Sequence, residues 1–309
     1  MFDQDGGAVY NDDNSVSHIL TNERSKLDEI RSSKYIYSLT DELFPEVKKQ
    51  LKAGNKVLVC GAPCQISGLY TFLKKDYENL ITCDFICKSV NSTKVFQKYI
   101  EWLENKYKSK AKKIKAKDKT TGWHRFSMRV DFENGKSYVA DRYNDPFFVG
   151  YLQTELFTME ACFNCQFRGF PRPADITLAD FWGIENVDKS MDQDLGTSLI
   201  IVNSEKGKEY YESLGDAIVS KEFTLKDAEP GNRALYEDAL NRVDRDLREA
   251  FYKDLDKYPF DEIAKKYFPM PTFKRKIMRK LSRFKKAFSF LSKVGFMPTN
   301  IYKLIKLNL

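Results

Sequence analysis

The sequence contains little histidine and no long hydrophobic run. Its two histidines, His18 and His124, are far apart and lack the short spacing of histidine metal ligands, so His124 is interpreted as a surface or packing residue. No apolar run approaches the roughly 20 residues that a membrane-spanning helix needs. A GxGxxG phosphate loop and a nucleophile elbow are also missing. These absences direct attention to the six cysteines as the carriers of chemistry.

The cysteines are expected to be reduced. The first residues, Met1–Asp5, are polar and acidic and do not resemble a signal peptide. The chain is therefore predicted to be cytoplasmic, where thiols stay reduced. Six cysteines in that compartment indicate metal or redox chemistry rather than structural disulfides.

Positive charge is concentrated at the carboxyl end of the chain. Residues 269–309 contain eleven Lys and Arg and no Asp or Glu, so the net charge of +7 for the whole chain becomes −4 for residues 1–268. We therefore expect an α/β domain over 1–268 and a basic tail over 269–309. The acidic body is not expected to bind nucleic acid.

The tail has the pattern of an amphipathic helix. Apolar residues recur in steps of three and four from Phe273 to Leu291, and Lys and Arg occupy other positions. Such a helix is typical of a segment that lies on an anionic membrane surface, which would place the protein at the inner face of the membrane. A solvated helix packed on the body is the alternative, and nucleic acid is the least favoured partner.

The clearest structural unit lies between residues 56 and 87. An apolar strand at 56–60 leads through the turn Gly61–Cys64 into a helix over 65–75, and a second strand follows at 80–87. Short connections of this kind predict two parallel strands and a mixed α/β fold class. Cys64 and Cys87 then fall at the carboxyl edge of the sheet, where open α/β sheets bind ligands.

Other segments complete the expected fold. Residues 94–108 indicate a helix, and the alternation around an Asn-Gly pair predicts a hairpin over 126–139. Residues 197–203 and 206–214 indicate a strand followed by a helix. The lysine-rich stretch 108–119 is interpreted as a solvated linker.

The last two cysteines form a CxxC pair, Cys162 and Cys165. Cys60 and Cys83 lie in apolar strands and are interpreted as core residues. Cys83 and Cys87 are about 13 Å apart along an extended strand, so they cannot share one small metal centre. The predicted ligand set is Cys64, Cys87, Cys162 and Cys165. Four thiolates suit zinc or an iron–sulfur cluster, and a single CxxC favours the cluster while zinc stays an alternative.

Four runs of sequence, in order and with matching spacing, resemble the coenzyme F420 hydrogenase/dehydrogenase beta-subunit family. They begin at Gly61 (GAPCQISGL), Cys83 (CDFICKSVNS), Cys162 (CFNCQFRG) and Ala174 (ADITLADFWG). The resemblance covers residues 34–214 most strongly. It implies an iron–sulfur flavoprotein fold in which a 4Fe–4S cluster lies beside FAD. The cluster ligands that it implies are Cys64, Cys87, Cys162 and Cys165.

The chain departs from the family pattern in three places. It has no N-terminal two-cluster ferredoxin module, and it lacks the Ser/Gly-rich turn that helps to hold the flavin in the family. Flavin binding is therefore expected to depend on the remaining residues or on a partner chain. The family's frequent Cys-His-Gly is Cys87-Lys88-Ser89 here, so a role of that histidine has no counterpart.

Further residues are candidates for cofactor contacts. Ser33-Lys34-Tyr35 resembles a family segment close to the flavin, and Gly61 and Gln65 belong to the cysteine turn. Arg168 and Arg172 are candidates for neutralising a flavin pyrophosphate, with ion pairs to Asp175 or Asp180 as the alternative. The expected cofactor-binding residues are Lys34, Gly61, Gln65, Arg168, Arg172 and Asp180.

These observations lead to two functional hypotheses. The first is an oxidoreductase subunit whose 4Fe–4S cluster exchanges electrons with a flavin or with a centre in a redox partner protein, such as a ferredoxin-like subunit. Members of this kind resemble proteins encoded with bacterial polysaccharide-synthesis enzymes, so a sugar or glycan precursor is a candidate substrate. The second is a non-catalytic module, stabilised by a cluster or by zinc, that acts as a binding partner in a larger complex.

Overall fold

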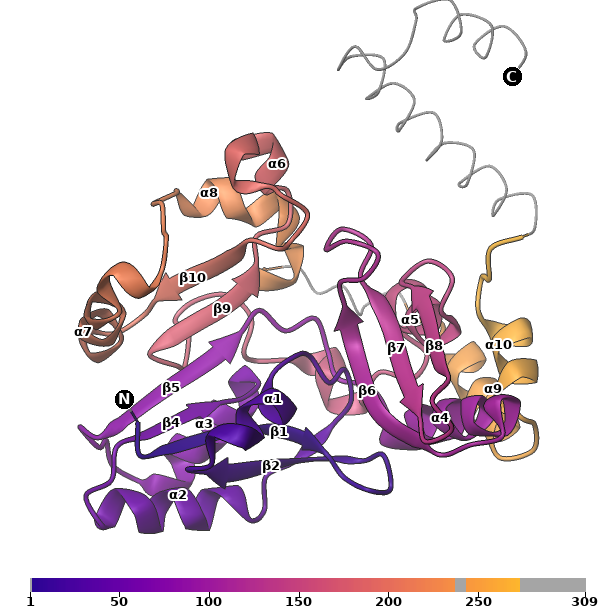
Figure 1. The fold of residues 1–309 in the computed structure, drawn as a ribbon, viewed down its shortest axis with the longest axis horizontal. Coiled ribbons are helices and arrows are strands. Elements are labelled where there is room, and N and C mark those ends of the chain that lie inside the picture. Colours follow the sequence, from indigo (N-terminus) through magenta and orange to yellow (C-terminus); the bar gives the residue numbers. More distant parts are fainter. Residues whose placement is uncertain (1, 237–242, 273–309) are drawn as a thin grey trace, which may run out of the picture. The chain divides into compact units, whose positions relative to one another are not determined.

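Two β-sheets and the helices around them form the described part of the chain. The structure is a computed structural model that describes residues 2–236 and 243–272 (Figure 1). It has a mixed α/β fold, which confirms the predicted fold class. Residues up to Phe268 belong to one compact unit.

The larger sheet contains seven strands. They are β1 (Gln4–Tyr10), β2 (Val16–Thr21), β3 (Ser38–Leu39), β4 (Val57–Cys60), β5 (Leu80–Phe85), β9 (Ile176–Asp180) and β10 (Ser198–Val202). Their spatial order is β10-β9-β5-β4-β1-β2-β3. The four central strands β9, β5, β4 and β1 are parallel. β10 runs antiparallel to β9 and β2 runs antiparallel to β1, whereas β3 pairs in parallel with β2. The parallel centre therefore has one carboxyl edge, at which its connections emerge.

The predicted strand–helix–strand unit is confirmed. It consists of β4, α3 (Pro63–Leu73) and β5, and the two strands pair in parallel. A proline at the first position of α3 favours a helix start there. α3 and α2 (Leu43–Lys52) pack their apolar residues on one face of these strands, where Val47, Val57, Leu69 and Leu80 are completely buried. This packing fixes the carboxyl ends of β4 and β5 in space.

A second, antiparallel sheet has the order β6-β7-β8. Its strands are β6 (Ala111–Asp118), β7 (Ser127–Phe132) and β8 (Ser137–Asp141). The predicted hairpin is confirmed as β7 and β8, with Gly135 at φ +79° in the turn. The prediction of a linker at 108–119 is wrong, because most of it forms β6. Exposed lysines are common on edge strands, where they discourage pairing with other chains.

The remaining helices surround the two sheets. They are α1 (Leu27–Ile30), α4 (Thr93–Tyr107), α5 (Pro146–Gln153), α6 (Ile184–Val187), α7 (Glu205–Ser213), α8 (Leu225–Ala228), α9 (Arg245–Leu255) and α10 (Phe260–Tyr267). α4, α5 and α10 share an aromatic core, in which the Tyr99 ring lies 5.5 Å from Phe147 and 5.3 Å from Phe260. The predicted helix at 94–108 is therefore confirmed as α4.

The predicted tail helix lies outside the described residues, which end at 272. The boundary between a body and a basic tail at residue 269 stays a prediction. None of the helices in the described ranges is long and apolar enough to cross a membrane.

Candidate functional site

Four cysteines lie at or near the carboxyl edge of the larger sheet. Cys64 is in the first turn of α3, just after β4, and Cys87 follows the end of β5. Cys162 lies in the 3-10 turn Glu160–Asn164, and Cys165 comes directly after this turn. Cys64 and Cys165 are exposed, and Cys87 and Cys162 are half-buried.

The four thiols are within electrostatic range of one another. Burial raises the pKa of Cys87 well above its usual value, and the thiols of Cys162, Cys64 and Cys165 raise this pKa further. Burial also raises the pKa of Cys64, and Cys162 and Cys165 add to that shift. Three separate segments of the chain thus bring their sulfurs to one region. Their role as ligands stays a prediction.

The spacing of the sulfurs bears on the metal centre that would fit. Zn–S bonds of about 2.3 Å place the sulfurs of a tetrahedral zinc site about 3.8 Å apart. Within residues 2–236 and 243–272, no three thiols have sulfurs within 4.8 Å of one another. A cubane cluster binds each ligand through a different iron and keeps the sulfurs further apart. In the described ranges, therefore, no three of the thiols have the close spacing of a tetrahedral zinc site.

The other two cysteines lie inside the sheet. Cys60 on β4 is the register partner of Cys83 on β5. Cys83 is only 7% exposed, and burial raises the pKa of Cys60 to about 11 and that of Cys83 to about 12. The burial of Cys83 agrees with its interpretation as a core residue, whereas Cys60 is half-buried at the end of β4.

Arg168 supplies positive charge beside the thiols. Its Nη2 donates to the carbonyl oxygen of Lys88 at 3.3 Å, and its charge opposes the rise in the pKa of Cys87 and of Cys162. Lys88 in turn forms an ion pair with Glu155 at 2.9 Å. Arg168 is therefore placed to balance the negative charge of thiolates.

Arg172 lies in the protein interior. Its Nη2 forms an ion pair with Asp84 Oδ2 at 2.9 Å, and its Nε donates to Thr177 Oγ1 at 3.2 Å. The side chains of Arg172 and Asp84 are 2% and 0% exposed. The alternative ion pair predicted with Asp175 or Asp180 is therefore wrong, because the partner is Asp84 on β5. Arg172 ties the segment after the CxxC pair to β5 and β9.

Lys34, Gly61 and Gln65 are close to the end of β4. Lys34 Nζ donates to three backbone carbonyl oxygens at the end of α1, at 2.5–3.0 Å, and burial lowers the pKa of Lys34 to about 8. Gln65 Oε1 accepts from the backbone N–H of Ala62, and Gln65 Nε2 donates to the carbonyl oxygen of Ser38, both at 2.9 Å. A Cβ at Gly61 would be 3.4 Å from Gln65 Oε1. These contacts fix the turn that leads to Cys64.

Asp180 belongs to a group of charges and rings that the sequence pattern did not reveal. It ends β9, forms an ion pair with Lys117 of β6, and accepts from Trp123 Nε1 at 2.9 Å. The rings of Trp123 and Trp182 stack at 4.6 Å. Arg142, which follows β8, and Lys117 lie 5.6 and 5.5 Å from the centre of the Trp182 ring. We call Lys117, Arg142, Asp180 and Trp182 the cation–aromatic cluster.

Positive charge exceeds negative charge in the cation–aromatic cluster. Burial lowers the pKa of Lys117, and the nearby charges of Lys119 and Arg142 lower it further, although Asp180 opposes them. The buried Nε of Arg142 has no hydrogen-bond partner in the part of the chain that the structure describes. Several cations around one carboxylate, with an aromatic ring beside them, suit a ligand that carries an anionic group on a planar ring.

Two tyrosines connect the cation–aromatic cluster with the thiols. The rings of Tyr35 and Tyr151 are 5.5 Å apart. Burial raises the pKa of Tyr151, and the Cys87 thiol adds to this shift. Burial raises the pKa of Tyr35 to about 12, and the charges of Asp180 and Arg142 also act on it. Tyr35 is thus within electrostatic range of Asp180 and Arg142, and Tyr151 is within electrostatic range of the Cys87 thiol.

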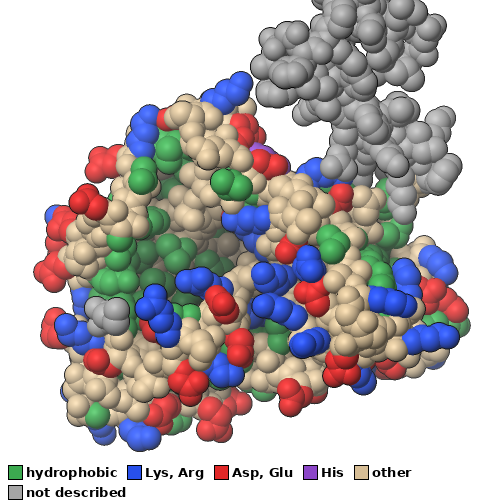
Figure 2. Space-filling model, in the orientation of Figure 1, with side chains coloured by type: hydrophobic (Ala, Val, Ile, Leu, Met, Phe, Trp, Pro, Cys, Tyr) green, Lys and Arg blue, Asp and Glu red, His purple; other side chains and the backbone are tan. Residues whose placement is uncertain are grey.

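One face of the larger sheet is exposed at β5, β9 and β10. Phe85, Leu178 and Ile200 are register partners on these strands, so their side chains point to the same face. Phe85 and Leu178 are each 37% exposed, and Val202 is 38% exposed. Figure 2 shows a hollow with hydrophobic side chains in its floor and Lys and Arg side chains at its margin. Exposed apolar surface of this kind is typical of ligand or partner sites.

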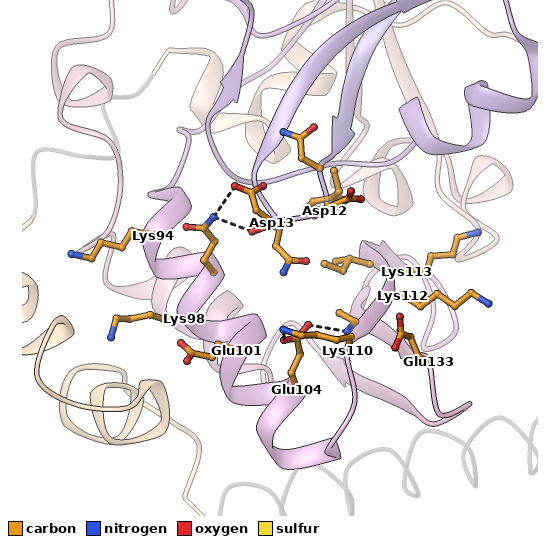
Figure 3. A pocket seen from close by; sticks show the side chains of 16 residues that line it. Asp12, Asp13, Lys94, Lys98, Glu101, Glu104, Lys110, Lys112, Lys113 and Glu133 are labelled. Atoms are coloured by element: carbon orange, nitrogen blue, oxygen red, sulfur yellow. Dashed lines mark hydrogen bonds and ion pairs between the residues drawn. The ribbon is translucent and has the colours of Figure 1, made fainter.

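A cavity of about 740 Å³ lies between the β1–β2 turn, α4 and β6 (Figure 3). Its charged side chains are of both signs. Within it, Lys110 forms an ion pair with Glu104 at 2.7 Å, and Gln97 donates to the carbonyl oxygen of Asp13 at 2.9 Å. None of the six cysteines lines it. Its balanced charges favour no ligand class, and it is not part of the thiol site.

Comparison with known proteins gives a family and several solved chains of similar fold. The family model for the carboxyl terminus of the beta subunit of coenzyme F420 hydrogenase/dehydrogenase matches residues 54–230. The fold is similar to a chain in a xenon-derivatised structure of the F420-reducing NiFe hydrogenase complex from Methanosarcina barkeri, with a TM-score of 0.51 and 17% identity. The match covers 83% of this chain and 82% of that chain. No curated protein matches the sequence.

Proposed function

Because the chain belongs to the family defined by the carboxyl-terminal part of the coenzyme F420 hydrogenase/dehydrogenase beta subunit, on a match over residues 54–230, we propose that it is an iron–sulfur oxidoreductase subunit. The observation that carries this proposal is the gathering of four thiols from three segments of the chain. In the proposal, a 4Fe–4S cluster is held by Cys64, Cys87, Cys162 and Cys165.

The residues present fit such a cluster. Four thiolates are its usual ligand set, and no three thiols of the described residues lie as close together as a zinc site requires. Iron binding favours the ionised thiol and would therefore overcome the raised pKa of the half-buried Cys87. Arg168 balances part of the negative charge that results. When bound, the cluster would supply one-electron transfer, and nearby charge and burial would tune its reduction potential.

A flavin-type cofactor is the second part of the proposal. In it, Lys117 and Arg142 pair with the cofactor's phosphate or with the anionic edge of its ring. The Trp182 indole offers a stacking surface for a planar ring. Tyr35, within electrostatic range of Arg142, is in ring contact with Tyr151, which is within electrostatic range of the Cys87 thiol, so a ring bound there would be near the cluster. The exposed apolar side chains on β5, β9 and β10 would cover the rest of such a ligand.

The electron partner is proposed to be another protein chain. The solved relative is a chain of a hydrogenase complex, and a protein docked at the exposed Cys64 and Cys165 would be close to the cluster. Coenzyme F420 and a sugar or glycan precursor of polysaccharide synthesis are the candidate substrates. Attachment of the basic tail to an anionic membrane surface from the cytoplasm completes the proposal.

A non-catalytic binding module is the second candidate function. The observation that favours it is that the cysteines come from three separate segments of the chain, which one metal centre would hold together. In that case the four thiols would hold zinc or a cluster only to tie together three chain segments, as structural metal sites do.

Anaerobic purification followed by metal analysis and visible and EPR spectroscopy tests the cluster. We expect broad visible absorption that dithionite bleaches and about four iron atoms per chain. Changing any one of the four predicted ligands to serine should lower the iron content, whereas Cys60→Ser should keep it. A colourless protein with stoichiometric zinc would contradict the redox proposal and favour the binding module. Equal iron loss in Cys60→Ser would contradict the ligand set.

Riboflavin and flavin mononucleotide have the same ring and differ in a phosphate, so they test the cation–aromatic cluster. Quenching of tryptophan fluorescence should show that the mononucleotide binds more tightly. Arg142→Gln should remove this preference and leave the cluster spectrum unchanged. The matched control Lys112→Gln, at an exposed lysine of β6, should keep the preference. Equal affinity for both flavins in the wild-type protein would contradict the proposed position, and no saturable binding of either would remove the flavin from the proposal.

A further inference from the structure

A second group of metal-ligating side chains does not include the thiols. The ligand atoms of His124, Glu185 and Asp192 all lie within 4.8 Å of one another. His124 Nε2 is 3.0 Å from Asp192 Oδ2. One imidazole nitrogen and two carboxylate oxygens are ligands that suit divalent transition metals such as zinc and manganese.

The three side chains come from three separate places in the fold. His124 is in the connection between β6 and β7, Glu185 is on α6, and Asp192 lies between α6 and β10. The two connections are held together, because the backbone N–H of His124 donates to Asp194 Oδ1 at 2.9 Å and that of Trp123 donates to the Asp194 carbonyl oxygen at 2.9 Å. The arrangement is therefore a product of the tertiary structure.

The negative charge of this group is not balanced by the residues that the structure describes. The carboxylates of Glu185 and Asp192 are close enough to repel each other. In residues 2–236 and 243–272, the exposed Glu185 side chain forms no hydrogen bond or ion pair. The Asp192 carboxylate accepts from the neutral backbone N–H of Asp194 at 3.1 Å, so the imidazole of His124 is the one group bonded to these carboxylates that can carry positive charge in the described ranges. A histidine carries one positive charge at most. A divalent cation would neutralise both carboxylates and leave the imidazole neutral.

We propose that His124, Glu185 and Asp192 bind a divalent transition-metal ion of the zinc class. The ion would join the β6–β7 connection to α6 and to the segment before β10. Three protein ligands leave coordination positions open to water or to an anionic ligand. Magnesium and calcium prefer sites made of oxygen ligands alone, so they should bind here more weakly.

Two tryptophans beside the site provide a direct readout. The His124 ring lies 4.8 Å from the Trp123 ring and 6.5 Å from the Trp182 ring. A paramagnetic Ni²⁺ ion bound to His124 should therefore quench tryptophan fluorescence. Zn²⁺, which is not paramagnetic, should reverse the quenching by competition.

Titration of the full-length, anaerobically purified protein with Ni²⁺ tests the proposal. We expect saturable quenching that Zn²⁺ reverses and that the same concentration of Mg²⁺ does not. His124→Ala and Glu185→Gln should each weaken the apparent affinity by about tenfold or more, since loss of even an outer-shell partner costs about 10- to 100-fold. The matched control Glu209→Gln, at an exposed carboxylate on α7, should leave the affinity unchanged.

The same titration contains the results that would overturn the proposal. Glu185 is exposed, so Glu185→Gln should fold normally and keep the test valid even where His124→Ala is unstable. Equal Ni²⁺ affinity in the wild-type protein and in both variants would overturn the site. Binding that bleaches the visible cluster absorption and persists in His124→Ala would assign the ion to the four thiols and would also overturn it.

Discussion

Arg172 and Asp84 form an ion pair whose side chains are 2% and 0% exposed. Removing one partner of such a pair leaves a buried charge without compensation. We expect Arg172→Met to lower the free energy of unfolding by about 3–5 kcal/mol, measured by urea unfolding under anaerobic conditions. The double variant with Asp84→Leu removes both charges, so it should lose less stability than Arg172→Met alone. A double variant that is less stable than the single one would show that the pair itself is not the cause.

Asp145 gives the folded protein a pH-dependent stability. Burial raises the pKa of this carboxyl from 3.8 to about 6, although Tyr99 and Tyr138 donate to its Oδ2 at 2.7 and 3.0 Å. Because the folded pKa is the higher one, the folded state binds the proton more tightly. The stability that this proton contributes is therefore full below pH 3.8 and is lost as the pH rises through about 6.

Asp145→Asn removes this titration and keeps an oxygen that caps α5. We expect its unfolding free energy to vary less than that of the wild-type protein between about pH 4 and pH 6, by about 3 kcal/mol at most. Urea unfolding of both proteins at several pH values in this range measures the difference. Parallel pH profiles would contradict the assignment to Asp145.

Among single residues, the cysteines were the easiest to interpret from the sequence. Cys64 and Cys87 follow predicted parallel strands, so topology alone placed them at one edge, and the structure puts both thiols in the electrostatic environment of Cys162. Lys117, Arg142 and His124 carried no such signal. Each of these residues is separated by many positions in the sequence from the residues that it contacts. Contacts of this kind depend on how the second sheet packs against the first.

The packing of α1 on β1 depends on the absence of a side chain at Gly7. A Cβ there would lie 2.3 Å from Ile30 Cγ2, a distance at which either the Ile30 side chain or α1 has to shift. Gly7→Ala should lower the free energy of unfolding by about 1–3 kcal/mol, the usual cost of overpacking. Adding Ile30→Ala should restore part of that loss, because it removes the atom that clashes.

Gly68 on α3 is the matched control. A Cβ at Gly68 would meet Phe44 at 3.5 Å, which is an ordinary contact distance. Alanine is also favoured over glycine inside a helix by about 1 kcal/mol, so Gly68→Ala should be neutral or stabilising in the same urea experiment. Equal losses in Gly7→Ala and Gly68→Ala would rule out the Ile30 clash as the cause.

Helices and strands whose apolar residues recur at a regular spacing were predicted from the sequence. Strands with many polar residues, such as β6, were not. The unit β4–α3–β5 combines buried strands with a helix whose apolar residues lie on one face, so its local pattern and its tertiary packing agree. β6 was misread because the lysines of Ala111–Asp118 resemble a solvated segment, although pairing with β7 makes the segment a strand. β9 was not predicted because its apolar run is short and ends at Asp180, which pairs with a lysine on the other sheet.

The uneven distribution of charge along the chain predicts which part of the chain binds lipid. Residues 1–268 carry a net charge of −4 and residues 269–309 carry +11, and each cation near an anionic membrane contributes about 1 kcal/mol. The full chain should therefore float with anionic vesicles at low salt and bind less as salt screens the attraction. A chain that ends at Phe268 should stay unbound and keep its visible spectrum. Equal flotation of the two chains, or equal binding to neutral vesicles, would contradict this role of the tail.

The division of the four thiols among three chain segments also sets an order of events in the cell. A ribosome makes Cys64 and Cys87 long before it reaches the CxxC pair, and domains begin to form from the N-terminal side during synthesis. A centre with four ligands cannot be completed until Cys165 has emerged. By then all strands from β1 to β8 have been made. If the proposed cluster site exists, metal insertion would therefore belong to a late stage of biogenesis, and cells that cannot build iron–sulfur clusters should accumulate chains with a formed β4–α3–β5 unit and an open ligand site.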